Sequence, residues 1–441
     1  MEQLPPPSPQ ASPFFDVRMR GFRDRVHVET VIGMVDDHSP PLPAETVPLT
    51  EAFGRVLASP LCAEVAVPGF NRAAMDGYAV RAEETFGATA YNPLSLTVVG
   101  QVLPGQPFAG VVESGQAVRI MTGAPMPDGA DAVVPAEYAQ EVGSIVRITE
   151  AVPPARHVSR VGEDIAPGRQ LFAAGRVLRP QDLGLLASVG IGTVPVVRRP
   201  TVAVMVTGDE LLPPGSKPSG YQIVDSNSPM LAALVQRDGG QVRLLPIVPD
   251  QPEALRQAMQ TASAEADVLL ISGGSSVGRE DHAPRLLAEM GRLLVHGVAL
   301  RPASPTGLGQ LGAALVFLLP GNPVSCLCAY DLFAGRAIRR LAGLCGDWPY
   351  LRLPARLSSK ISSALGRTDY VRLRWVGPAT TAEAVGAVEP LAISGASILS
   401  TTTIADGFTL VDAACEGYPV GATIEVYLYD RVFANPPRSP Q

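Results

Sequence analysis

The segment best suited to binding an anion is a glycine- and serine-rich stretch that follows an apolar run. After the apolar residues 268–271 the chain reads SGGSSVG over 272–278, and the polar residues Arg279, Glu280 and Asp281 come next. Glycines allow backbone N–H groups to approach an oxyanion closely, and serine hydroxyls add further donors. The lysine of a G-x-x-x-x-G-K-[ST] nucleotide loop is missing. The stretch therefore predicts either an anion-binding loop or an ordinary glycine-rich turn between a strand and a helix.

Two other polar segments also follow apolar runs. Asp209 and Glu210 come after the run 201–206, and such paired carboxylates could hold a metal ion or a substrate amine or amide, or form a solvated turn. Farther along, the prolines of PGNPVS fix a rigid turn, from which Asn322 and Ser325 could face the same crevice. Three polar loops on one sheet edge would indicate a site more strongly than any single loop does.

The elements that must position these loops form an alternating pattern. Between residues 200 and 345, apolar strand-like runs alternate with runs of helical periodicity. This alternation predicts a parallel sheet with helices on both faces, in which ligands bind beyond the carboxyl ends of the strands.

The regions on either side of 200–345 have a different residue pattern. Short β-prone runs separated by glycine and proline predict a small all-β domain over about 60–154, and similar runs after Trp348 predict a second one. Helical spacing predicts a helix through Val28 and Val35 and a short one over 49–57. The proline- and serine-rich residues 1–13 are typical of a disordered tail.

Composition excludes several classes of protein. A hydrophobic content of 46% with 17% charged residues indicates packed domains rather than disorder. The net charge of −7 disfavours nonspecific binding to nucleic acid. The five cysteines lack the spacing of a zinc or disulfide framework. No signal peptide and no run of ~18 apolar residues is found, so we expect a soluble cytoplasmic protein without a membrane span.

Several segments, taken in order, resemble one known family. They are NRAAMDGYAVRA, IMTGAPMPDGADAVVP, VGEDI, TGDEL, DSNS, SGGSSVG and PGNPVS. Together they closely resemble the MoeA/gephyrin molybdenum insertases, over nearly the whole chain from about Arg25 to Tyr429. CinA-type and MogA-type proteins share only the glycine-rich molybdopterin-binding domain, so they would not account for the flanking segments.

The resemblance implies a multidomain α/β plus β architecture. It consists of an elongated domain made of two chain segments, an inserted β domain, an α/β molybdopterin-binding domain and a C-terminal β-barrel-like domain. The expected boundaries are 1–24 (disordered tail), 25–58 with 158–195 (elongated domain), 59–157 (inserted β domain), 196–346 (α/β domain), 347–433 (C-terminal β domain) and 434–441 (disordered tail).

The resemblance also implies a reaction. Adenylylated molybdopterin and molybdate would give molybdenum cofactor and AMP, with Mg²⁺ offsetting the phosphate charge through oxygen ligands. It implies a homodimer whose active site is shared between subunits. A MogA/MoaB-type adenylyltransferase and molybdoenzyme maturation proteins would be its partners.

Site residues follow by matching motif to motif. Catalytic roles fall to Asp76, Thr122, Glu210 and Asp281, of which Glu210 and Asp281 would also bind the metal ion. Arginines of the C-terminal domain would flank the crevice, although they could equally form the charged outer face of a strand. The positions implied for substrate binding are Asp164, Asp250, Gly273, Gly274, Ser276, Gly278, Arg301, Asn322, Ser325, Arg367 and Arg372.

The chain departs from the family pattern at residues that would bind anions. Gly297 and Ser304 stand where lysines are usual, which leaves Arg301 as the cation of this stretch, and Ala396 stands where a serine is usual. A guanidinium keeps the charge and binds oxyanions bidentately. Each lost charge-assisted hydrogen bond would remove roughly 1.5–3 kcal/mol. A non-catalytic molybdopterin-binding or partner-docking scaffold is therefore the alternative to an active insertase.

Overall fold

The computed structural model describes residues 25–274, 282–377, 386–392 and 397–429. The chain forms two compact units, one from the described residues of 1–45 and 197–441 and the other from residues 46–196. Ser276, Gly278, Asp281 and Ala396, together with both expected tails, lie outside the described residues. None of the described helices is long and apolar enough to cross a membrane.

A six-stranded sheet is the centre of the first unit. Four neighbouring strands are parallel, as the alternating pattern predicts, but the last two run antiparallel to their neighbours. Only Gly312 and Ala313 separate β20 from β21, and so short a connection permits a hairpin and no crossover. In spatial order the strands are β16 (Gln241–Leu244), β13 (Thr201–Val206), β17 (Val268–Ser272), β21 (Ala314–Leu319), β20 (Gly307–Leu311) and β18 (Arg292–His296).

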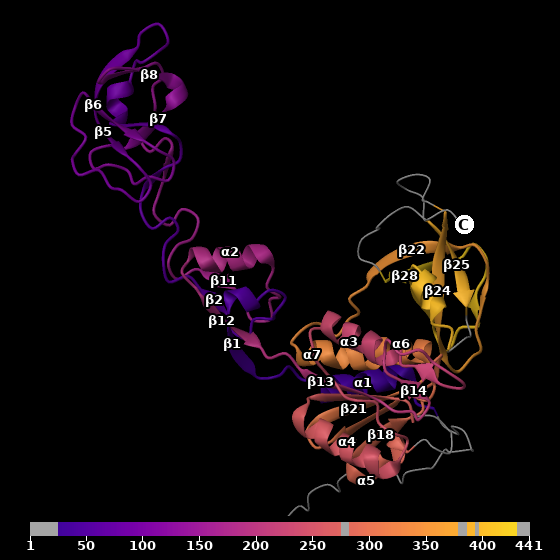
Figure 1. Cartoon of the computed structure of the whole chain (residues 1–441). Coiled ribbons are helices and arrows are strands. Elements are labelled where there is room, and N and C mark those ends of the chain that lie inside the picture. Colours follow the sequence, from indigo (N-terminus) through magenta and orange to yellow (C-terminus); the bar gives the residue numbers. More distant parts are fainter. Residues whose placement is uncertain (1–24, 275–281, 378–385, 393–396, 430–441) are drawn as a thin grey trace, which may run out of the picture. The chain divides into compact units, whose positions relative to one another are not determined.

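Helices cover both faces of this sheet (Figure 1). Alternate strand residues enter two different cores: Val204 and Leu270 join one, whereas Met205 and Ile271 join the other. Every residue of β17 is buried, which explains its continuous apolar run. One face carries α1 (Val28–His38), α3 (Asn227–Arg237), α6 (Pro323–Ala329), the π-helical turn η4 (Tyr330–Ala334) and α7 (Gly335–Leu341); the other carries α4 (Pro252–Glu265) and α5 (Ala283–Met290).

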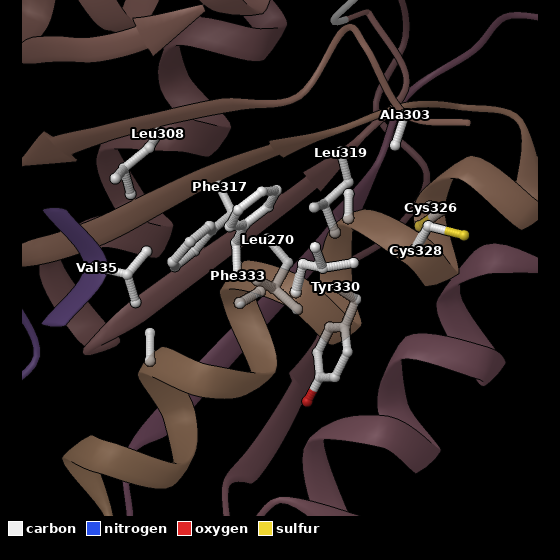
Figure 2. Close-up of a cluster of buried hydrophobic side chains, with 14 of the residues drawn as sticks. Val35, Leu270, Ala303, Leu308, Phe317, Leu319, Cys326, Cys328, Tyr330 and Phe333 are labelled. Atoms are coloured by element: carbon white, nitrogen blue, oxygen red, sulfur yellow. The ribbon is translucent and has the colours of Figure 1, made fainter. Parts of the chain in front are cut away.

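The larger of these cores joins the sheet to the helices that follow β21. Figure 2 shows Phe317 and Leu319 of β21 among side chains of η4 and α6, including Phe333 and Cys328. These side chains are fully buried. The core therefore fixes the helix that begins at the PGNPVS turn against the strand that precedes this turn.

The C-terminal β domain is a closed five-stranded barrel, as the resemblance implies. The order β24-β25-β22-β28-β26 closes because β24 also pairs with β26. The short β19 (Leu300–Arg301) extends the outer edge of β24. The barrel strands are β22 (Leu351–Leu357), β24 (Thr368–Gly377), β25 (Ala387–Ala392), β26 (Gly407–Val411) and β28 (Thr423–Leu428), and β23 (Ile361–Ser362), β27 (Gly417–Tyr418) and α8 (Ser400–Ile404) complete the domain.

A buried carboxylate joins the barrel to the α/β domain. Asp331 of η4 is fully buried and accepts hydrogen bonds from the Tyr350 hydroxyl at 2.9 Å and from Arg237 at 3.1 Å. Its backbone oxygen accepts a 2.8 Å bond from the Trp348 indole. Burial raises the pKa of Asp331, and the Arg237 charge opposes this rise. Partners from both domains thus converge on one side chain.

The second unit consists mainly of β structure. Its six-stranded sheet has the order β7 (Ala132–Pro135), β4 (Gly77–Val80), β6 (Gln116–Ile120), β5 (Leu94–Val102), β9 (Ile145–Ile148) and β8 (Ala139–Val142). This is the all-β character that the sequence predicts. Outside the sheet lie α2 (Pro180–Ser188), the 3₁₀ turns η2 (Ala82–Thr85) and η3 (Ala136–Tyr138), and the pairs β1 (Ala44–Pro48) with β12 (Thr193–Val197), β2 (Leu61–Cys62) with β11 (Gln170–Phe172), and β3 (Arg72–Ala73) with β10 (Val158–Ser159).

The helix predicted over 49–57 is wrong. Only the 3₁₀ turn η1 (Leu49–Glu51) forms, and Gly54 adopts a φ of +72°, which is outside the right-handed helical region. Val56 and Leu57 then form β-bridges to Val177 and Val196. Pairing with residues more than a hundred positions away in sequence overrides the local helical spacing.

The core predicts a clear difference between two identical substitutions. Leu270→Ala should lower the free energy of unfolding of the first unit by about 2–5 kcal/mol, because it leaves a cavity in a fully buried strand. Leu365→Ala, at a side chain that is 60% exposed, should change it by less than about 0.5 kcal/mol. Urea denaturation followed by circular dichroism checks both, and equal effects of the two would contradict this assignment of the core.

Candidate functional site

The carboxyl ends of β13, β17 and β21 border a crevice of about 600 Å³. A volume of this size accommodates a small molecule. Its walls are the turns that follow the three strands, the start of α3 and one residue of the C-terminal domain. The lining residues are Val206, Thr207, Glu210, Leu211, Ile223, Val224, Asp225, Ser226, Asn227, Asp250, Ser272, Gly273, Gly274, Gly321, Asn322, Pro323 and Ser397.

Backbone hydrogen bonds hold the three strand ends together. The Thr207 amide donates to the Ser272 carbonyl at 3.0 Å, and the Gly273 amide donates to the Leu319 carbonyl at 3.3 Å. Gly273 has a φ of +99°, and a Cβ there would lie 2.4 Å from the Thr207 oxygen. Glycine is therefore required at this turn, both by its backbone angle and by the close approach of Thr207.

Three carboxylates line the crevice in different environments. Glu210 is exposed. Asp250 is half-buried and accepts a short hydrogen bond from the Thr207 hydroxyl. Asp225 is buried and accepts from the amides of Asn227 at 2.9 Å and Ser228 at 3.1 Å, which fixes the first turn of α3. Two carboxylates are thus held by the fold, and Glu210 reaches into solvent.

The crevice brings together part of the predicted site, one residue predicted to be catalytic and metal-binding (Glu210) and four predicted to bind substrate. Glu210, Asp250, Gly273, Gly274 and Asn322 all line it. Ser325 does not: it is 4% exposed within α6, because the helix that starts at Pro323 turns it towards the interior. Asp209, the neighbour of Glu210, instead borders an adjoining hollow of about 450 Å³ with Pro213, Pro246 and Pro249.

The predicted arginines are not among the residues that line the crevice. Arg301 forms a close ion pair with the fully buried Asp369, and the Arg367 Nε lies 3.7 Å from the same carboxylate. The Ser363 hydroxyl donates to Asp369 at 2.6 Å. Arg372 is 1% exposed on β24 and so cannot form the charged outer face of this strand. Arg301 and Arg367 thus belong to a polar cluster whose internal counter-ion is Asp369.

Asp76 and Thr122 come together in the second unit. The Thr122 hydroxyl and amide donate to Asp76 Oδ1 at 2.7 and 2.6 Å. These two hydrogen bonds, the one from the hydroxyl first, lower the pKa of Asp76. Asp164 lies in a different turn, where its amide donates to the Val67 carbonyl at 3.0 Å and its own carbonyl accepts from Arg169 at 2.7 Å.

Sequence reasoning missed several residues of the crevice. Thr207, Asp225, Asn227 and Ser272 line it, and the hydroxyl of Ser397 donates to Asn322 at 2.7 Å. The DSNS segment was a signal for Asp225 and Asn227, since it belongs to the matched motifs. No local pattern pointed to Ser397, which reaches the crevice through the fold of a separate domain.

The described residues contain no group of three histidine, cysteine, aspartate or glutamate side chains placed to hold a metal ion. Asp281, one of the two predicted metal ligands, lies outside them. The buried Cys326 lies 3.7 Å from the Ser272 hydroxyl, and burial raises the pKa of its thiol to about 12. This thiol is therefore protonated at neutral pH and unsuited to binding a metal ion.

The hydrogen bonds to Asp76 predict a measurable titration. Thr122→Val removes the largest cause of the shift and should raise the pKa of Asp76 towards its ordinary value, whereas Thr122→Ser should leave it low. Because the pKa is lowered in the folded state, the contribution of Asp76 to stability is present above the ordinary pKa and is lost as pH falls. Carboxyl ¹³C NMR titration checks this, and an unchanged pKa in the valine variant would contradict it.

Models of known protein families match most of the chain. Family models match it as the MoeA N-terminal region (domains I and II) over residues 26–190, a probable molybdopterin binding domain over 203–340 and the MoeA C-terminal region (domain IV) over 354–429.

Individual relatives agree with these models. A putative molybdopterin biosynthesis protein of Methanocaldococcus jannaschii is 36% identical over 87% of this chain and 91% of its own length. Molybdopterin molybdenumtransferase 2 of Mycobacterium tuberculosis is 36% identical over 74% of this chain and 82% of its own. The crystal structure of a Pyrococcus horikoshii MoeA protein matches with a TM-score of 0.78 at 32% identity, covering 92% of this chain and all of that one. The chain belongs to the MoeA family.

Proposed function

We propose that this protein is a molybdopterin molybdenumtransferase, which inserts molybdate into adenylylated molybdopterin and releases AMP. The observation that carries the proposal is the crevice at the carboxyl ends of β13, β17 and β21, where glycine turns and carboxylates meet in one small-molecule site. Relatives named for this activity are similar to the chain over most of its length. As a cytoplasmic enzyme it would receive its substrate from an adenylyltransferase of the MogA/MoaB type.

The glycine turn would bind the phosphate end of the substrate. Gly273 and Gly274 carry no side chain, so the wall of the crevice is open to close approach by phosphate oxygens. Ser276 and Gly278 would extend this contact, and Asn322 would form the opposite wall with Ser397. Ser325 would support the site from within α6, and Asp164 would contribute to substrate binding. Holding the pterin substrate and molybdate close together would give the proximity that the ligand exchange at molybdenum needs.

The charge of the crevice supports a role for Mg²⁺. Glu210, Asp225 and Asp250 place carboxylates where an anionic pyrophosphate would bind. The available donors are oxygens, which suit Mg²⁺, and this ion is usually held by one or two carboxylates together with substrate phosphates. Glu210 and Asp281 would hold it, and it would offset the negative charge of the phosphates. Asp250 would stay oriented by Thr207.

Cationic groups of the barrel would receive molybdate. Arg301 and Arg367 share the carboxylate of Asp369, and an oxyanion could take the place of this carboxylate because guanidinium groups bind both bidentately. Arg372 would add charge from within β24. In a homodimer, Asp76 and Thr122 would complete the active site of the partner subunit.

The proposal predicts AMP release that depends on molybdate and Mg²⁺. Release should saturate as molybdate is titrated, should stop when EDTA removes Mg²⁺, and should yield active cofactor. Glu210→Gln should lower the rate on the order of 10²-fold because it removes a metal-binding charge, while Glu253→Gln, at a side chain that is 89% exposed on α4, should not. Pterin binding without AMP release would support the non-catalytic scaffold instead.

The shared-site proposal predicts complementation between two inactive variants. Asp76→Ala and Asp281→Ala should each abolish insertion without dissociating the dimer. A mixed dimer should regain up to about half of the wild-type rate, since one of its two sites then has both carboxylates. Activity of co-purified, differently tagged subunits measures this, and a mixed dimer as inactive as its parents would rule out a site shared in this way.

A further inference from the structure

The crevice contains a side chain that contacts two of its walls at once. Asn227 is the first residue of α3 and is 7% exposed. Its Nδ2 donates to the Ser272 hydroxyl at 2.9 Å and to the Gly321 carbonyl at 2.7 Å. The three residues come from segments 45 and 94 positions apart in sequence. One amide group thus joins α3 to the last residue of β17, which leads directly into Gly273, and to the turn that follows β21.

The orientation of this amide is fixed by its partners. The Gly321 carbonyl can only accept, so the NH₂ group must face it. The Ser272 hydroxyl accepts from Asn227 and lies 3.5 Å from the Pro320 carbonyl, to which it can donate in turn. The amide oxygen of Asn227 is buried without a hydrogen-bond partner among the described residues. The group therefore acts here through its two donors.

The backbone of Asn227 is held independently of its side chain. Its amide donates to Asp225 at 2.9 Å, and the Ser228 hydroxyl donates to the same carboxylate. Leu231 and Val235, one and two turns farther along α3, are fully buried against the sheet. Removing the side-chain amide should therefore release the two turns while α3 stays in place.

The two turns that Asn227 joins also pack against each other. A Cβ at Gly321 would lie 3.5 Å from the Gly273 Cα, and Gly273 and Gly274 both have positive φ. Glycine backbones have many accessible conformations, so these turns need an external restraint to present one surface to a ligand. We propose that Asn227 is the positioning residue that supplies this restraint, holding the phosphate-binding turn and the Asn322 turn at a fixed separation.

This inference rests on the proposed function for its activity test but has a structural test of its own. Asn227→Ala should increase deuterium uptake in peptides covering 268–274 and 314–322, with uptake elsewhere unchanged. In AMP release it should lower kcat by about 10- to 100-fold, the range expected when reacting groups are displaced by roughly an ångström. The KM should change less, because the lining side chains remain.

Two more variants test whether the hydrogen bonds of Asn227, and not merely the volume of its side chain, are needed. Asn227→Asp fills the same space but has no donors at neutral pH, so it should fail to restore either readout. Ser272→Ala removes one of the two acceptors and should have a smaller effect. The effects of Asn227→Ala and Ser272→Ala should not add in the double variant, because both remove the same bond. Asn92→Ala, which breaks an exposed 3.1 Å side-chain bond to the Gly87 carbonyl in the second unit, is the matched control.

Each outcome decides the inference. Unchanged uptake in both turns in Asn227→Ala, kcat within about twofold of wild type, or rescue by the aspartate would overturn it. If Asn227→Ala fails to fold, Ser272→Ala tests the inference in its place. Deuterium uptake and kcat equal to those of the wild type in Ser272→Ala would then overturn it. Wild-type protein that releases no AMP would refute the proposed function alone, since the deuterium uptake is measured without substrate.

Discussion

The arrangement of the site depends on one constraint, the parallel pairing of β13, β17 and β21. Neighbouring parallel strands end at the same edge, so whatever follows each of them must meet. Here the three following segments are polar turns, and the backbone bonds from Thr207 to Ser272 and from Gly273 to Leu319 continue the pairing beyond the strands. The antiparallel strands β20 and β18 lie at one edge of the sheet, away from β13 and β17.

Strand pairing alone leaves the far wall of the crevice undefined, and the barrel supplies it. Asp331 is buried in the π-helical turn after α6. It accepts hydrogen bonds from Tyr350, which directly precedes the barrel strand β22, and from Arg237 of α3. A buried carboxylate stripped of either partner would cost several kcal/mol, so the two domains are held in one arrangement. That arrangement lets Ser397 bond Asn322 across the crevice. Polar contacts between the two domains thus help to place a side chain of the C-terminal domain at the crevice.

The sequence predicts the parts of this fold that follow from local periodicity. The alternating strands and helices, the continuous apolar run of β17 and the polar turns after each strand were all readable because each depends on neighbours in the chain. The predicted helix over 49–57 failed because bridges from Val56 and Leu57 to distant residues outweighed the local spacing. Glu210 and Asn322 lie in the matched motifs and are predicted as site residues. Asn227 also lies in one of them, DSNS, but the contacts that define its role are with residues far away in sequence, so the sequence alone assigns it none.

The same reasoning explains the predicted arginines. From sequence, Arg301 appeared as the single cation left in a stretch where lysines are usual, and hence as a free anion-binding group. The fold gives it a counter-ion 68 positions away, Asp369, which also approaches Arg367 and accepts from Ser363. An oxyanion binding at this cluster would therefore have to compete with a carboxylate that is already buried and ion-paired with Arg301. The absence of the usual lysines and the pairing of Arg301 with Asp369 would act in the same direction, because both lower the net positive charge that the cluster could offer to an oxyanion. If the cluster binds an anion as proposed, its affinity would depend on how readily Asp369 gives up its partners, and not simply on how many cations the stretch contains.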